Sequence, residues 1–293
     1  MRTFEFEAPE TIDEAVSLLK KAGGSARPLA GGTDLVVQMK ESATRFPYPA
    51  TIVSLDRISE LRGIDFADGG GLRIGAGATM TDVATHPAIR ERYAALAEGA
   101  GFVGSLQTMN MATIGGNVCN AAPSADTAPP LLVYDAEAVI IGPDGRRTLP
   151  IAELFRGPGQ TALAPDELLV ELRLPAPTPA TGAAYQRNTP RKQMDIAVVG
   201  VAVALTLSGD TIERARVALG AVAPTPLRAK SAEAALEGKP ANDETFAKAA
   251  AAAVEDSSPI TDIRASAEFR RHLVKVMTAR QLAEAANRAK GSA

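Results

Sequence analysis

Apolar and polar positions along the first 25 residues follow two different periods. Residues 3–6 alternate at a period of two, which is typical of a short strand. Apolar side chains then recur at helical spacing over residues 12–19, where Thr11 and Glu14 form a capping box at a helix start. Gly23-Gly24 ends the expected helix, because glycine is favoured just beyond helix C-termini.

The alternation of strands and helices continues to residue 55. Residues 27–30 are expected to form a second strand, Gly31-Gly32 a turn, and Thr33-Asp34 the start of a second helix. Residues 51–55 are expected to form a third strand. A helix after each of the first two strands predicts a small unit with a parallel sheet, since parallel strands need long crossover connections.

From residue 61 onward the pattern mixes strands and helices differently. Strands are expected over residues 61–64, 72–74, 136–141, 147–150 and 167–174. One helix is expected over residues 81–98, and the segment 113–117 is expected to interrupt helical structure. The turn at 143–145 joins two of these strands into a hairpin, which favours an antiparallel sheet.

The segment 175–182 has three prolines in eight residues and is the best candidate for a linker. After it, the pattern predicts three strands followed by three helices. The strands are expected over residues 183–187, 196–207 and 214–221, and the helices over 231–237, 242–254 and 266–290. The C-terminal part is therefore expected to have the order β-β-β-α-α-α.

The 293-residue chain has an ordinary globular composition, with 46% apolar and 22% charged residues. Cys119 is its single cysteine, which excludes an internal disulfide scaffold and an iron–sulfur cluster held by four thiolates. The net charge of −3, from 31 basic and 34 acidic residues, disfavours nucleic-acid binding. Aromatic residues make up only 4% and include no tryptophan, which disfavours base stacking.

Targeting signals are not evident in the sequence. Acidic residues occur in the first seven positions, where a signal peptide has an apolar run. The most apolar stretch, at 196–207, is much shorter than the ~20 residues that a membrane-spanning helix needs. We expect a cytoplasmic protein, either free or associated with a membrane through a complex.

Two glycine pairs carry the strongest chemical signal. Leu29-Ala30-Gly31-Gly32-Thr33-Asp34-Leu35 joins an expected strand to an expected helix, and Thr113-Ile114-Gly115-Gly116-Asn117 contains the second pair. Glycine lets backbone N–H groups approach a phosphate closely, so the two loops could hold a pyrophosphate from opposite sides. The alternative is two unrelated turns, the first of them capped by Thr33 or Asp34.

Other motifs exclude common reaction classes. Residues 99–104 match G-x-G-x-x-G, but they follow an expected helix rather than a strand, so this dinucleotide fingerprint is rejected. His86 and His272 are the two histidines, and neither has partners at metal-ligand spacing. The sequence has no nucleophile elbow and no Walker A motif. No catalytic or metal-ligating residue is therefore assigned, and Cys119 either lines a cofactor site or is a buried spectator thiol.

Two polar groups are further candidates for cofactor binding. Asp126 follows the second glycine pair closely and could accept hydrogen bonds from sugar hydroxyls, or it is a cap or surface residue. Arg187, Arg191 and Lys192 form a basic group before an apolar strand. They could pair with a phosphate or a reduced flavin anion, or they are a solvated strand end.

Taken in order, these motifs resemble the FAD-binding medium subunit of molybdenum hydroxylases, the carbon monoxide dehydrogenase and xanthine dehydrogenase family. Each motif alone is weak, but the ordered set is specific and covers nearly the whole chain. The segments that carry the resemblance are 30–35, 112–117, 123–126, 157–159, 163–169, 195–201, 262–266 and 268–273.

The resemblance implies an α+β fold with two parts. The first is a two-lobed FAD-binding domain of the vanillyl-alcohol-oxidase (PCMH) type, over residues 1–176 with lobes of about 1–57 and 58–176. The second is a domain like the C-terminal domain of CO dehydrogenase flavoproteins, over residues 177–293. The break between them agrees with the proline-rich segment.

The resemblance also implies the cofactor contacts. The FAD pyrophosphate is expected between the two glycine loops, and Asp126 and Leu169 match positions that contact FAD in the family. Arg187 stands where the family often has lysine, which keeps the charge but changes its shape. Ile196 matches a position near the flavin ring that is aromatic in some members, so an aliphatic contact is expected here.

The function implied is that of an electron-transfer flavoprotein subunit. Electrons are expected to pass from two [2Fe–2S] clusters of a small subunit to FAD on this chain, and then to NAD, a quinone or another acceptor. A large subunit is expected to hold the molybdenum cofactor, and the complex is expected to be a dimer of heterotrimers. Two alternatives remain: a stand-alone FAD-dependent oxidoreductase of the same fold, and a scaffold subunit that has lost its cofactor.

Overall fold

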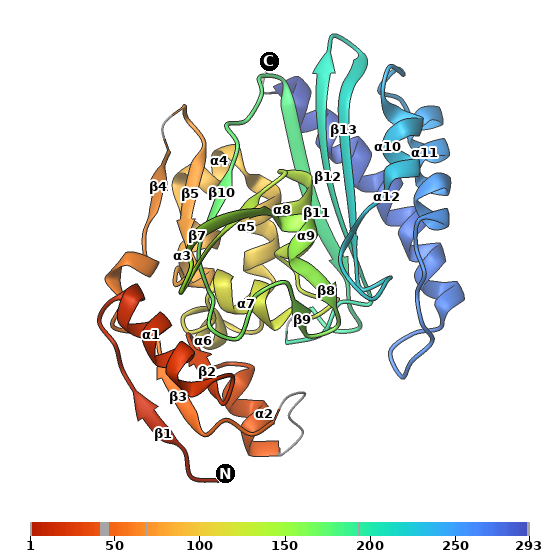
Figure 1. The fold of residues 1–293 in the computed structure, drawn as a ribbon. Helices are drawn as coiled ribbons and strands as arrows, with labels where there is room; N and C mark the ends of the chain where they lie inside the picture. The colour runs from red at the N-terminus through yellow and green to blue at the C-terminus, as the bar shows by residue number, and fades with distance from the viewer. Residues whose placement is uncertain (1, 42–46, 68, 193, 292–293) are drawn as a thin grey trace.

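Three larger sheets follow one another along the chain, besides a two-stranded sheet of β8 (Phe155–Gly157) and β9 (Gln160–Thr161) (Figure 1). The computed structural model describes residues 2–41, 47–67, 69–192 and 194–291. The first sheet has the order β1 (Glu5–Glu7), β3 (Thr51–Ser54), β2 (Ala26–Leu29). The second has the order β4 (Ile64–Phe66), β5 (Leu72–Gly75), β10 (Leu168–Leu174), β6 (Glu137–Gly142), β7 (Gly145–Pro150). The third has the order β11 (Thr181–Asn188), β12 (Val199–Ser208), β13 (Thr211–Gly220), β14 (Leu227–Arg228).

The first sheet is parallel, as the sequence predicts, because β3 pairs in parallel with both of its neighbours. Helices α1 (Ile12–Ala22) and α2 (Leu35–Glu41) follow β1 and β2. Thr11 caps α1 by accepting a hydrogen bond from the Glu14 backbone N–H. The Glu14 carboxylate accepts from the N–H of Glu10 rather than of Thr11, so the expected capping box is displaced by one residue.

The second sheet is antiparallel and contains the predicted hairpin of β6 and β7. The sequence-based prediction for its first strand, at 61–64, is wrong, because the strand begins three residues later. Leu61 is buried and ends the short 3-10 helix η1 (Ser59–Leu61), and its carbonyl accepts a hydrogen bond from the Gly77 N–H at 2.7 Å. Leu61 therefore belongs to η1 rather than to the strand, which begins at Ile64.

The helix predicted over 81–98 is in fact three helices. They are α3 (Met80–Thr85), α4 (Pro87–Arg92) and α5 (Ala94–Gly101). Pro87 has no N–H to continue α3 and disfavours helical geometry at His86, so it stands instead at the first position of α4. The remaining elements before residue 168 are α6 (Leu106–Met109), α7 (Ile114–Asn120), α8 (Ala128–Val133), α9 (Ile151–Leu154), β8 (Phe155–Gly157) and β9 (Gln160–Thr161).

The C-terminal part has the predicted order of three strands and three helices, with the two-residue β14 added between them. Its helices are α10 (Lys230–Leu236), α11 (Asp243–Glu255) and α12 (Ala267–Gly291), and they cover one face of the third sheet (Figure 1). The other face packs against α5 and α8. Strand β12 begins at Val199, three residues later than the pattern predicts.

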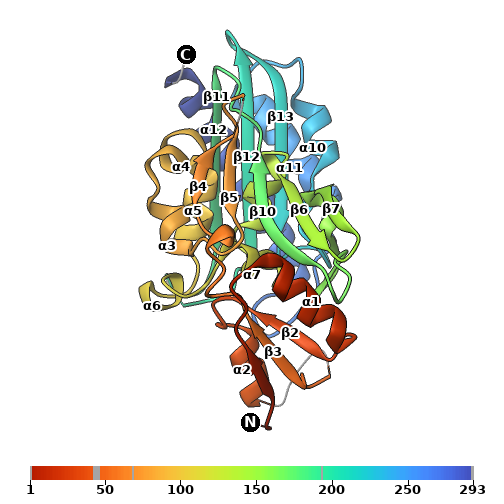
Figure 2. The ribbon, with the colours of Figure 1, turned by 60° about the vertical axis from the view of Figure 1, so that its left-hand side comes forward.

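Three hydrophobic cores join these layers. One lies between the third sheet and its helices. A second extends from the second sheet and the central helices into the third sheet, through Ala183, Tyr185 and Ala202. A third joins α1 to the second sheet through Leu19, Leu61 and Val139, which seats the N-terminal unit at one end of the molecule (Figure 2). None of the helices in the described ranges is both long and apolar enough to cross a bilayer.

Candidate functional site

The two glycine loops are far apart in the sequence, but at Gly31 the first loop contacts the residues that directly precede the second. A Cβ atom built on Gly31 would lie 1.7 Å from the carbonyl oxygen of Met111 and 3.0 Å from the backbone nitrogen of Ala112. Backbone therefore touches backbone at this point, and any side chain at Gly31 would push the loops apart. This contact brings loop 29–35 directly against the residues that precede Thr113.

Gly32 has a different requirement. Its φ of +71° lies in the left-handed region, and a Cβ there would meet side-chain atoms of Leu29 at 3.0 Å and Val36 at 3.2 Å. The Gly32 carbonyl accepts a hydrogen bond from the Val36 N–H, which fixes the start of α2. Thr33 and Leu35 are half-buried, whereas Asp34 is exposed.

The second glycine loop opens a helix instead of interrupting one, which corrects the expectation for residues 113–117. Thr113 is the N-cap of α7, and its hydroxyl accepts a hydrogen bond from the Gly116 N–H at 3.0 Å. Gly115 packs against Ala76, where a Cβ would come within 2.6 Å of the Ala76 Cβ. The Thr113 backbone also forms a bridge with Thr79, so the loop is fixed on two sides.

Asp126 is buried and bound to the C-terminal sheet. Its Oδ1 accepts a hydrogen bond from the Tyr185 hydroxyl at 2.7 Å, and its Oδ2 accepts from Arg187 Nη1 at 2.6 Å. Burial raises the pKa of Asp126 to about 6, although Arg187 and Tyr185 act in the opposite direction. The 2.6 Å contact makes Asp126 and Arg187 a buried ion pair, in which the carboxylate neutralises the charge of the guanidinium.

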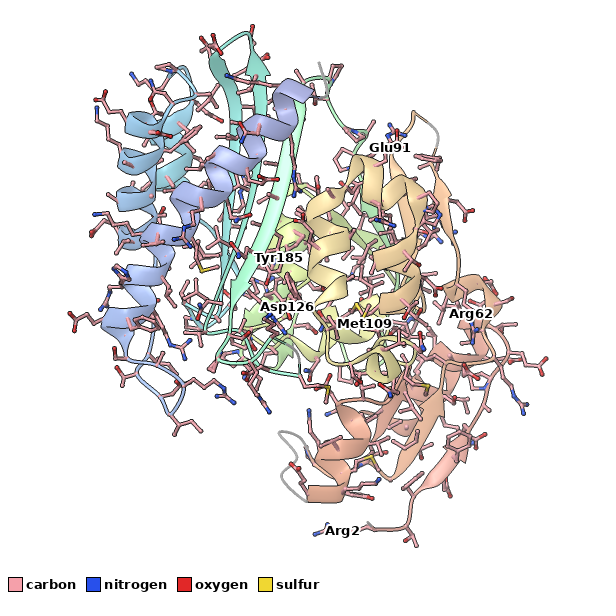
Figure 3. All side chains as sticks on the ribbon, turned by 180° about the vertical axis from the view of Figure 1, so that it is seen from behind. Arg2, Arg62, Glu91, Met109, Asp126 and Tyr185 are labelled. Carbon is pink, nitrogen blue, oxygen red and sulfur yellow. The ribbon has the colours of Figure 1, made fainter. Side chains whose placement is uncertain are left out.

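Arg187 keeps two nitrogens without a partner. Its Nε and Nη2 atoms are buried and make no hydrogen bond among the described residues, while Nη1 is bound by Asp126. The guanidinium carbon lies 5.2 Å from the centre of the Phe102 ring, and Phe102 in turn contacts Tyr185 edge-on. Figure 3 labels Asp126 and Tyr185 where the third sheet meets the central helices.

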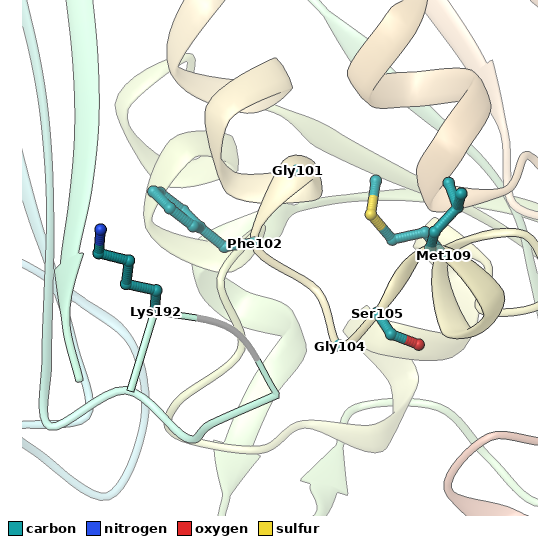
Figure 4. Close-up of a pocket in the computed structure, with 7 residues that line it drawn as sticks. Gly101, Phe102, Gly104, Ser105, Met109 and Lys192 are labelled. Carbon is teal, nitrogen blue, oxygen red and sulfur yellow. The ribbon is translucent and has the colours of Figure 1, made fainter. Parts of the chain in front are cut away.

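A pocket of about 320 Å³ lies beside this group of residues (Figure 4). Phe102 forms part of its wall, and Lys192 reaches it from the segment between β11 and β12. The other lining residues, all from α5, α6 and the loop between them, are Gly101, Gly104, Ser105, Leu106 and Met109. The segment 99–104, rejected as a dinucleotide fingerprint, thus forms one wall of the pocket.

The structure brings some of the site residues predicted from the sequence into contact with one another. Asn117 links the second glycine loop to the segment of Asp126, because its Oδ1 accepts a hydrogen bond from the Thr127 hydroxyl at 2.7 Å. Leu169 is buried in β10 beside a bulge, in the same hydrophobic core as Ile114. Ile196 is 46% exposed and precedes β12.

Three residues of this region are missed by the sequence-based prediction as functional candidates: Phe102, Met111 and Tyr185. Tyr185 could have been predicted from the sequence, because it lies two residues before the candidate Arg187 and such residues share one face of a strand. The positions of Met111 and Phe102 depend on tertiary contacts that periodicity does not show. Within the described ranges, no group of three histidine, cysteine or acidic side chains is placed to hold a metal ion.

Cys119 belongs to α7 and packs against the central core. Burial raises the pKa of its thiol to about 12, so the thiol stays protonated and unreactive at neutral pH. Its packing against the central core favours the spectator thiol over a residue that lines a cofactor site.

Comparison with known families gives matches along almost the whole chain. Residues 2–177 match the model of the FAD binding domain in molybdopterin dehydrogenase. Residues 184–285 match the model of the CO dehydrogenase flavoprotein C-terminal domain.

Individual proteins are similar over nearly their whole length. The putative xanthine dehydrogenase FAD-binding subunit of Escherichia coli K12 is 37% identical over 96% of this chain and 95% of its own. The carbon monoxide dehydrogenase medium chain of Hydrogenophaga pseudoflava is 37% identical over 95% of this chain and 96% of its own. A solved carbon monoxide dehydrogenase from the same organism matches with a TM-score of 0.93 and 38% identity, covering 98% of each chain.

Quinoline 2-oxidoreductase from Pseudomonas putida 86 matches with a TM-score of 0.90 and 30% identity, covering 99% of this chain and 98% of its own. The identity and coverage in these matches exceed what a shared fold alone produces. The chain belongs to the family of FAD-binding subunits of xanthine and carbon monoxide dehydrogenases, which are molybdenum hydroxylases.

Proposed function

We propose that this FAD-binding subunit passes electrons from the [2Fe–2S] clusters of a small partner subunit, through FAD, to an external acceptor. The molybdenum cofactor would be held by a large partner subunit, in a dimer of heterotrimers. Support comes from the relatives, which are named as subunits or chains of dehydrogenases, and one of the similar structures is a Cu,Mo-CO dehydrogenase. In this proposal no side chain of the subunit acts as a general acid or base.

The residues present fit FAD, and the meeting of the two glycine loops is the observation that carries the proposal. At Gly31 the backbone lies directly against that of Met111 and Ala112, which brings the first glycine loop beside the start of the second. We assign the pyrophosphate to loops 29–35 and 113–117. Neither loop carries a basic side chain. The N–H groups of residues 114–117 already donate within the chain, so backbone N–H groups of loop 29–35 would supply the hydrogen bonds and the second loop would shape the cradle.

Arg187 is the second feature that fits the cofactor. A buried guanidinium with two unpartnered nitrogens is costly, and an acceptor on a bound group would satisfy them. Bound FAD would supply the redox chemistry, because a flavin exchanges electrons singly with iron–sulfur clusters and in pairs with an acceptor. Leu169 and Ile196 are proposed to complete the contacts, and Asp126 to contribute through Arg187, because both of its carboxylate oxygens are bound within the chain.

The test is to purify the native protein with whatever accompanies it, and to record its visible spectrum and metal content. Flavin bands together with iron and molybdenum are the expected result. Flavin on a lone 30.4 kDa chain that itself oxidises a substrate would instead favour the stand-alone oxidoreductase. No flavin after addition of FAD would contradict the proposal and favour a scaffold subunit.

A further inference from the structure

Tyr185, Asp126 and Arg187 form a buried chain of hydrogen bonds across two parts of the fold. Tyr185 and Arg187 are two residues apart on β11 and therefore point to the same face. Each uses one oxygen of the Asp126 carboxylate, Tyr185 at 2.7 Å and Arg187 at 2.6 Å. With both oxygens engaged, the carboxylate cannot rotate without breaking a bond, so it holds Arg187 in one orientation.

Strand β12 leaves room for the Tyr185 hydroxyl. Gly200 pairs with Arg187 in the sheet register, and a Cβ at Gly200 would lie 2.7 Å from the Tyr185 hydroxyl oxygen. Glycine inside a strand costs roughly 0.5–1 kcal/mol relative to alanine. The glycine is therefore needed where it stands, because a larger residue would displace the hydroxyl from Asp126.

The orientation of Arg187 leaves one edge of its guanidinium unused. Nη1 is bound to Asp126, whereas Nε and Nη2 have no partner in the described part of the chain and are shielded from water. Nε–H and one Nη2–H point in the same direction and form a fork that can bind two neighbouring acceptor atoms at once. A lysine ammonium offers no such fork.

We propose that Tyr185 and Asp126 are positioning residues that hold Arg187 so that its Nε–Nη2 edge binds two adjacent acceptor atoms of the flavin ring. This inference rests on the proposed binding of FAD. It assigns Tyr185 a role that acts entirely through Arg187. It also makes arginine better suited than lysine to this chain, because lysine cannot use the orientation that Tyr185 and Asp126 impose.

The test is a double-mutant cycle of Y185F and R187K, with FAD affinity of the purified subunit measured by flavin fluorescence. Y185F is expected to weaken FAD binding about three- to tenfold, which is less than a hydrogen bond to a charged group contributes, because Tyr185 acts on FAD only through Arg187. R187K is expected to weaken it at least as much. The double variant should bind no more weakly than R187K alone, because Tyr185 has nothing left to position.

Two further variants control for structure. Y93F removes another buried tyrosine hydroxyl bond, the one to the Pro175 carbonyl at 2.8 Å, and should leave FAD affinity unchanged. D126N keeps the shape of the carboxylate, so it replaces Y185F in the cycle if that variant folds poorly. It should also raise the flavin midpoint potential, because the charge of Arg187 is no longer neutralised.

Several results would overturn the inference. Losses in Y185F and R187K that multiply in the double variant would show that Tyr185 acts independently of Arg187. Unchanged FAD affinity in both single variants would show that the Arg187 edge does not bind the flavin, although FAD binding itself would stand. A wild-type chain that binds no FAD would instead refute the proposed function, so the two failures are distinct.

Discussion

The Glu98 carboxylate of α5 accepts a hydrogen bond from the backbone N–H of Tyr185 on β11, at 2.7 Å. Its other oxygen accepts from Arg288 Nη2 of α12, also at 2.7 Å. One side chain therefore joins the central helices to both the edge strand and the last helix of the C-terminal part. The same edge strand carries Tyr185 and Arg187, so Glu98 also holds the strand that presents them.

E98A should destabilise this junction. It leaves the Tyr185 N–H without its acceptor and removes one of the partners of Arg288, which we expect to cost about 1–3 kcal/mol of unfolding free energy. Denaturant unfolding of the flavin-free subunit measures the loss. E284Q is the matched control, since Glu284 pairs with the same Arg288 from within α12 and should change stability by a few tenths of a kcal/mol at most. Equal losses in the two variants would contradict this role for Glu98.

G31A should abolish FAD binding. The added methyl would overlap the Met111 carbonyl oxygen, 1.7 Å away, so the two glycine loops must separate. Equilibrium dialysis with FAD measures the effect, and G291A is the control because a Cβ at Gly291 meets no atom within 4 Å. Full flavin content in G31A would refute the two-loop assignment.

T113A should loosen the second loop. The Thr113 hydroxyl caps α7 by accepting from the Gly116 N–H, and loss of such a cap costs about 1 kcal/mol. We expect a lower unfolding temperature and weaker FAD binding in T113A. T113S keeps the hydroxyl and should restore most of both properties. If T113S behaved like T113A, the methyl group rather than the cap would be responsible.

Glu171 is a buried carboxylate bound by two arginines, and this arrangement predicts a loss of stability in acid. Burial raises the pKa of Glu171, but hydrogen bonds from Arg73 and Arg173 outweigh it and lower that pKa below its usual value. A carboxyl with a lowered folded-state pKa stabilises the fold above its unfolded pKa of about 4.3, and this contribution is lost as the pH falls further. E171Q should therefore show a flatter dependence of unfolding free energy on pH below about 5. An identical dependence in wild type and E171Q would exclude Glu171 as the source.

Asp135 makes a second charged junction. Its carboxylate binds Arg214 and Arg228 at 2.8 and 2.7 Å, and Arg216 at 3.1 Å, all three from the C-terminal sheet. D135N isolates the charge, because asparagine tolerates the left-handed backbone that Asp135 adopts with φ of +49°. Since Asp135 is 40% exposed, we expect a loss of about 1 kcal/mol that shrinks as salt is added. A loss independent of salt would contradict an electrostatic origin.

Local patterns in the sequence predicted most elements of this fold. The parallel first sheet, the β6–β7 hairpin and the C-terminal order of strands and helices all follow from periodicity and turn residues. The helix break at Pro87 was missed because apolar spacing continues across it. Thr113 is a recognisable cap, but the glycines after it suggested a break rather than a helix start.

The candidate site was only partly predictable for a different reason. Gly31, Gly116 and Arg187 could be selected by residue type and by resemblance to the family. The bond between Asp126 and Tyr185 joins residues 59 positions apart, and no local period encodes such a contact. The same holds for Gly31 and Met111, whose backbones touch only in the folded chain.

The bonds of Asp126 to Tyr185 and Arg187 limit where the chain can be truncated or recombined with a relative. Asp126 lies within the segment that matches the FAD-binding family model, at 2–177, while Tyr185 and Arg187 lie within the segment that matches the C-terminal model, at 184–285. A truncation between these segments would leave a buried carboxylate without its cation. An exchange of either segment with that of a relative would succeed only if the incoming segment kept a carboxylate at the position of Asp126, or partners for it at the positions of Tyr185 and Arg187. The two segments are thus constrained to be inherited together, even though each matches a family of its own.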